Sequence, residues 1–79
     1  MDLDTARIDE AVLALLHLGL HDGCRAWKGF DWDAMDRLHK AGWISDPVNK
    51  TKSVVLTEEG LVESERLLRT LFAKPASKT

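Results

Sequence analysis

The stretch MDRLHKAGWI, residues 35–44, together with VLTEEG, residues 55–60, decides the fold. In the first stretch a helical pattern ends at Gly42, a residue typical of helix C-termini, and a β-prone Trp-Ile pair follows. In the second stretch a β-prone Val-Leu pair leads to Thr57, which precedes two glutamates as a helix N-cap does. Residues 46–52 between them are polar and rich in turn formers. This pattern predicts a two-stranded hairpin across residues 43–56, between two helices.

Outward from this hairpin, apolar spacing predicts three helices, near residues 5–20, 31–41 and 57–72. Asp31 is the expected N-cap of the second helix, and residues 21–29 are expected to form a loop with at most one helical turn. Each helix has an apolar face that is expected to be buried. These faces consist of Ile8, Val12, Leu15, Leu16 and Gly19 on the first helix, Trp32, Met35 and Leu38 on the second, and Leu61, Leu68, Leu71 and Phe72 on the third.

The predicted fold class is therefore α+β and winged-helix-like, with three main helices and one two-stranded hairpin as the wing. Residues 31–72 resemble the second half of bacterial winged-helix regulators of the multiple-antibiotic-resistance and phenolic-acid type. In that family a helix that ends in Leu-x-x-x-Gly and Ile is followed by the wing, and the next helix begins at a Leu-Thr-x-x-Gly motif. The residues of this chain that match the pattern are Leu38, Gly42, Ile44, Leu56, Thr57 and Gly60. We expect one domain over residues 1–73 and a disordered tail over residues 74–79.

Nearly the whole chain also resembles a small bacterial family of uncharacterised proteins, domain of unknown function 6429. The resemblance runs through IDEAVLALL (residues 8–16), RAWKGFDW (residues 25–32), SDPVNK (residues 45–50) and LTEEG (residues 56–60). It implies a cytoplasmic bacterial protein and carries no activity.

Composition bounds the function. The 79 residues carry a formal charge of −2, which is too close to neutral for a strongly basic nucleic-acid-binding protein. A single cysteine, Cys24, excludes an intrachain disulfide framework and suits a reducing compartment. The acidic N-terminus and an apolar stretch too short for a bilayer favour a cytoplasmic location, with no membrane partner.

No group of side chains in the sequence predicts a catalytic or metal-binding site. His17 and His21 lie one helical turn apart and Cys24 follows, but the glutamate of a His-Glu-x-x-His zinc site is absent. A cysteine nucleophile would need His21 or His39 beside Cys24, an orienting group and a pocket. We therefore expect no enzyme, no catalytic residue, no metal, no cofactor and no small-molecule substrate.

Four of the five aromatic residues lie in one part of the sequence, and Phe72 lies outside it. Trp27, Phe30, Trp32 and Trp43, interleaved with Arg25 and Lys28, can be interpreted as a stacking platform for single-stranded nucleic acid. In a domain this small the same residues are needed for the core. We expect at least two of the three tryptophans in the core and one at an interface.

Two functions remain open. In a DNA-binding winged helix the second helix would be the recognition helix, and Arg37, Lys40, Lys50 and Lys52 would contact DNA. The carboxylates of Asp31, Asp33 and Asp36 would repel its phosphates, which disfavours this function. The preferred hypothesis is a protein-interaction module that binds a second copy of itself or another protein.

The proposed interface of that module is the first helix. Because this helix is more apolar than one core face requires, Leu13 and Leu20 would meet water unless a second copy covers them, with Trp27 nearby. In the alternative, residues 25–29 fold back and cover Leu13 and Leu20 within one chain, with Trp27 as a lid.

Overall fold

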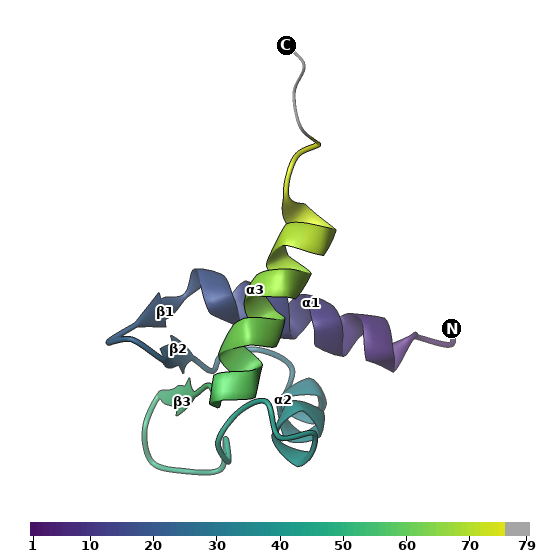
Figure 1. Ribbon diagram of the computed structural model, residues 1–79. Helices are drawn as coiled ribbons and strands as arrows, with labels where there is room; N and C mark the ends of the chain where they lie inside the picture. The colour runs from purple at the N-terminus through teal and green to yellow at the C-terminus, as the bar shows by residue number, and fades with distance from the viewer. Residues whose placement is uncertain (76–79) are drawn as a thin grey trace.

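The computed structural model describes residues 1–75. Most of the tail predicted over residues 74–79, from residue 76 onward, lies outside the described residues. The described chain is an α+β fold of three helices and a three-stranded antiparallel sheet, ordered β1-β2-β3 (Figure 1). In sequence the elements are α1 (Thr5–Leu18), β1 (Leu20–His21), β2 (Arg25–Trp27), α2 (Trp32–Lys40), β3 (Ser53–Val55) and α3 (Glu58–Phe72). The sheet lies at the C-terminal end of α1, and α3 crosses α1.

Side chains cap the helices where the sequence predicts it. Asp31 accepts a hydrogen bond from the backbone N–H of Ala34 at 3.1 Å, and Thr57 Oγ1 accepts from that of Gly60 at 2.9 Å. These bonds satisfy amide groups that have no partner inside the helix. Both predicted N-caps are confirmed.

The end of α2 is also as predicted. Gly42 has a φ of +87°, the left-handed conformation that glycine adopts without strain. The N–H of Trp43 donates to Leu38 O and that of Gly42 to His39 O, both at 3.0 Å, which together form a Schellman motif. The motif turns the chain sharply out of α2 toward the sheet.

The predicted two-stranded hairpin is confirmed only where Ile44 pairs with Leu56, and the main partner of residues 53–55 is a different strand. β3 pairs with β2 in the register Ala26 to Val54, and residues 43–44 contribute one isolated bridge, Ile44 to Leu56. Residues 21–29, expected to be a loop, contain the whole of β2 and one residue of β1, His21. Asp22 and Gly23, with φ of 49° and 86°, form the tight turn between these strands, because this conformation matches the twist of a hairpin. The winged-helix assignment is not confirmed by this sheet.

The core lies between α1, the inner face of the sheet and the other two helices. It contains Val12, Leu13, Ala14, Leu16, Ala26, Ala34, Met35, Leu38, Ile44, Val54, Leu56 and Leu67. α1 is buried on more than one side because the sheet packs on it as well as α2 and α3. Its excess of apolar residues is thus largely accounted for within one molecule.

The buried face of α3 agrees with the predicted one at Leu61 and Leu68, which pack partly buried against the core, and differs elsewhere. Gly60, Ser64 and Leu67 are buried, whereas Leu71 and Phe72 are exposed. A Cβ on Gly60 would lie 2.0 Å from Trp43 O, so only glycine lets α3 approach the residues after α2 so closely. This approach leaves the C-terminal turn of α3 beyond the core. None of the helices described in residues 1–75 is long and apolar enough to cross a membrane.

Candidate functional site

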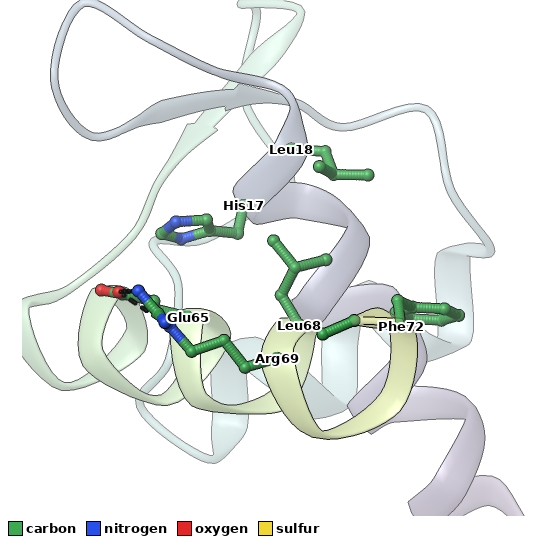
Figure 2. A pocket seen from close by; sticks show the side chains of 7 residues that line it. His17, Leu18, Glu65, Leu68, Arg69 and Phe72 are labelled. Atoms are coloured by element: carbon green, nitrogen blue, oxygen red, sulfur yellow. Dashed lines mark hydrogen bonds and ion pairs between the residues drawn. The ribbon is translucent and has the colours of Figure 1, made fainter. Parts of the chain in front are cut away.

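A groove of about 470 Å³ lies between the C-terminal ends of α1 and α3. Leu18 on α1 and Leu68 and Phe72 on α3 supply its apolar walls (Figure 2). Leu18 is 67% exposed and Phe72 is 51% exposed, so two large apolar side chains face solvent across the same hollow. Exposed apolar side chains that gather in a hollow are typical of binding sites.

His17 joins the two helices beside this groove. Its Nδ1 lies 2.9 Å from Ser64 Oγ, and Ser64 Oγ donates its proton to Leu61 O at 3.0 Å. Because the hydroxyl has only one proton, the Nδ1–H of His17 is the donor to Ser64. The hydrogen bond satisfies a fully buried hydroxyl and holds the C-terminal end of α1 against α3.

Two charged side chains border the groove on α3. Arg69 donates from Nη2 to Glu65 Oε2 at 2.7 Å, and both side chains are at least half exposed. This hydrogen bond lowers the pKa of Glu65 below its ordinary value, with a further contribution from the positive charge of Arg69. The groove therefore presents one anion and one cation next to an apolar surface.

The Ser64 and His17 pair does not form a nucleophile site. Ser64 is 0% exposed, and its proton is directed to a backbone carbonyl of its own helix. A serine nucleophile must reach its substrate and pass its proton to the base. The pair is thus a structural contact between helices.

The structure does not bring the predicted interface residues together on one exposed surface. Leu13 is 1% exposed and belongs to the core, so its assignment to an interface is wrong. Leu20 packs partly buried against the core. Residues 25–27 do fold back, as the alternative held, but only Ala26 enters the core. Trp27 is 60% exposed on the opposite side of β2, because successive strand residues face opposite ways.

The residues assigned to DNA contact fall into two groups, one with ion-pair partners among residues 1–75 and one without. Arg37 donates to both carboxylate oxygens of Asp9, at 2.6 and 2.8 Å, and Lys40 Nζ lies 2.9 Å from Asp36. Lys50 and Lys52 are exposed in the loop before β3 and have no ion pair within the described chain. The two cations of α2 are therefore neutralised locally, and the two of the loop are not.

The histidines and the cysteine are dispersed. His39 Nδ1 lies 3.1 Å from Ile44 O, and His21 Nδ1 lies 3.4 Å from a carboxylate oxygen of Asp22. Cys24 is a partly buried free thiol in the turn between β1 and β2. Within residues 1–75 no group of three or more histidine, cysteine, aspartate or glutamate side chains is placed to hold a metal ion.

Only one of the three tryptophans packs against the core, which contradicts the expectation of at least two. Trp43 is partly buried there, whereas Trp27 and Trp32 are 60% and 56% exposed. Met35 and Leu38 fill the buried face of α2 together with the small Ala34, which leaves Trp32 at the rim of this face.

Leu18 and the exposure of Phe72 were missed by pattern reasoning. One signal existed: α1 carries more apolar residues than one core face requires, up to its C-terminal end, so some of them had to meet solvent or a neighbour. Which residue did so depends on where α3 crosses, and periodicity does not contain that information.

The comparisons with known proteins place the chain in a family. It is 61% identical over 74 residues to uncharacterized protein y4hR of Sinorhizobium fredii (strain NBRC 101917 / NGR234), an alignment that covers 94% of this chain and all of the relative. No solved structure matches the chain. Residues 4–74 match the family described as domain of unknown function (DUF6429). This chain belongs to the DUF6429 family.

Proposed function

We propose that this protein is a non-enzymatic interaction module that binds a second copy of itself through the groove between α1 and α3. The observation that carries the proposal is the pair of exposed side chains, Leu18 and Phe72, on either side of an apolar hollow. Each leucine or phenylalanine fully buried on association contributes about 1.5–3 kcal/mol before the cost of association.

A second copy is the partner that the charges of the groove favour. In a twofold-symmetric dimer the same patch meets itself, so it must contain both members of every polar pair. Glu65 and Arg69 supply an anion and a cation on the same helix, one turn apart. In a symmetric dimer Arg69 of each copy would reach Glu65 of the other, while the apolar side chains meet at the centre.

The DNA-binding alternative through α2 has less support. A recognition helix needs cations that are free to meet phosphates and base edges. On α2, Arg37 is held by Asp9 and Lys40 by Asp36, and Asp31 and Asp33 stand at its N-terminal end.

Sedimentation equilibrium tests the proposal. The native chain should dimerise at protein concentrations of about 100 µM, the range in which a moderate interface is populated. Leu18→Lys should yield a monomer, because the ammonium group would be buried in the groove on association. At the C-terminal end of α1 a cation is compatible with the helix dipole, so the fold should remain.

Val62→Lys is the matched control, since Val62 is 72% exposed on α3 outside the groove and Glu58 lies four residues before it. This variant should dimerise as the native chain does. A native chain that stays monomeric, a Leu18→Lys variant that still dimerises, or a Val62→Lys variant that does not would each overturn the proposal.

A further inference from the structure

The outer face of the sheet carries a second feature that self-association does not use. Arg25 and Trp27 on β2 both face outward, with the buried Ala26 between them. The register places His21 and Val55 on either side of Arg25, and Ser53 beside Trp27. An exposed tryptophan thus lies next to an exposed arginine on the outer face of the sheet.

Trp27 is exposed but held in place. The outer end of its indole ring lies over Gly29, where a Cβ would come within 2.0 Å of ring atom Cη2. The Phe30 ring is 6.5 Å away, centroid to centroid, at an angle of 57°. Because the ring is positioned before any ligand arrives, a base that stacks on it would lose little free energy to ordering the side chain.

The charge of this region is opposite to that of the rest of the molecule. Residues 20–28 and 45–55 contain four basic residues (lysine or arginine) and two aspartates. The rest of the sequence contains seven basic residues and eleven acidic ones. Arg25, Lys50 and Lys52 have no ion pair in the part of the chain that the structure describes.

Lys28 fixes the loop that carries two of these cations. Its Nζ donates to Pro47 O at 2.6 Å and to Asn49 O and Oδ1 at 3.2 and 3.0 Å. Its backbone N–H donates to Lys52 O at 3.1 Å. The loop before β3 is therefore tied to the end of β2, and Lys52 is presented next to the strand end that carries Trp27.

We propose that this outer face binds single-stranded nucleic acid, with a base stacked on Trp27 and phosphates at Arg25, Lys50 and Lys52. Every base has a flat face that stacks on an aromatic ring, and cations beside the ring attract the backbone, so this combination binds without reading sequence. Unpaired bases are required, because in a duplex the base faces are already stacked.

Fluorescence anisotropy of labelled oligo-dT and oligo-U of about 15 nucleotides, at about 50 mM salt, tests the proposal. The native chain should bind at least one of the two, and the pair distinguishes DNA from RNA. Trp27→Ala should weaken binding at least about fivefold, as expected for the loss of one stacked base. Gly29→Ala keeps the indole but displaces it, and should weaken binding too.

Trp32→Ala is the matched control, because Trp32 is similarly exposed but lies on the acidic start of α2. It should change the affinity less than about twofold. Lys52→Ala should reduce the slope of log affinity against log salt by about 0.7, the loss of one phosphate contact to a single strand. This readout remains decisive if Trp27→Ala fails to fold.

Three results would overturn the proposal. The first is the absence of binding to both oligonucleotides. The second is an equal loss in Trp27→Ala and Trp32→Ala. The third is binding of duplex DNA or heparin as tight as that of the single strands, with an unchanged salt slope in Lys52→Ala.

Discussion

Arg37 on α2 donates two parallel hydrogen bonds to Asp9 on α1, from Nε to Oδ2 at 2.6 Å and from Nη2 to Oδ1 at 2.8 Å. The hydrogen bond to Asp9 raises the pKa of Arg37 above its ordinary value, against the effect of desolvation. This geometry connects the N-terminal half of α1 to α2, on the side of the molecule away from the sheet. Two-point contacts of this kind fix orientation as well as distance.

Loss of this pair should destabilise the protein without unfolding it. Asp9→Asn removes the charge but keeps the shape, so the melting temperature should fall measurably, though by less than it does on truncation of a core leucine. Asp36→Asn is the control, because its ion pair with Lys40 is within one helix and largely exposed. A smaller fall for Asp9→Asn than for Asp36→Asn would contradict the importance of the α1–α2 contact.

Leu13→Ala should cost about 2–5 kcal/mol in the free energy of unfolding, because Leu13 is buried in the core. Leu18→Ala, at the exposed end of the same helix, should change this free energy by less than about 0.5 kcal/mol at concentrations where the chain is monomeric. Chemical denaturation measures both. Similar values for the two variants would show that the core is wrongly described.

Gly60→Ala should destabilise the protein by about 1–3 kcal/mol, although alanine is the better helix former. The added Cβ would lie 2.0 Å from Trp43 O, a backbone atom held by the hydrogen bond it accepts from the N–H of Thr57. Gly19→Ala is the matched control, with its nearest neighbour at an ordinary 3.7 Å. Thermal melts should show a clear loss for the first variant and little change for the second. A neutral Gly60→Ala would contradict the close approach of α3.

Stability should decrease as the pH falls through the acid range. Hydrogen bonds from Arg66 and Arg69 lower the pKa values of Glu63 and Glu65 below the ordinary 4.5. A carboxylate whose pKa is lower in the folded state stabilises the fold above its unfolded pKa, and this contribution is lost as the pH drops through the folded value. The melting temperature should therefore fall below about pH 4.5.

The Glu63→Gln variant isolates one of these carboxylates. Glu63 is the less exposed of the two, so this substitution should flatten the acid part of the curve more than Glu65→Gln does. Because both pairs lie near solvent, about 1 M salt should also flatten the curve of the native chain. Acid dependence identical in the native chain and Glu63→Gln would show that the Glu63 and Arg66 pair does not contribute.

The helices could be predicted from the sequence because their signals are local. Asp31, Thr57 and Gly42 act within one turn of their own position, and each does in the structure what its residue type predicts. The β1–β2 hairpin could not be found by periodicity, since strands of two and three residues contain no repeat. The turn residues Asp22 and Gly23 were the remaining signal.

The candidate site was less predictable, because it depends on how elements cross. Leu13 and Leu18 are both apolar residues of α1, but Leu13 is covered by the core and Leu18, at the C-terminal end of the helix, is 67% exposed. The buried face of α3 consists of Gly60, Ser64 and Leu67, so two of its three members are small residues that apolar periodicity does not mark. Phe72, although large and apolar, is 51% exposed and lines the groove.

Contacts across the dimer interface are the most direct test of the central claim, that a second copy occupies the groove between α1 and α3. In a mixture of isotope-labelled and unlabelled chains, a filtered NOE experiment detects only protons that lie close together on different molecules. We expect intermolecular signals between the Phe72 ring and the methyl groups of Leu18, and their loss in Leu18→Lys. Intermolecular signals confined to Trp27 or Val62, or none at a concentration of about 1 mM, would contradict the account.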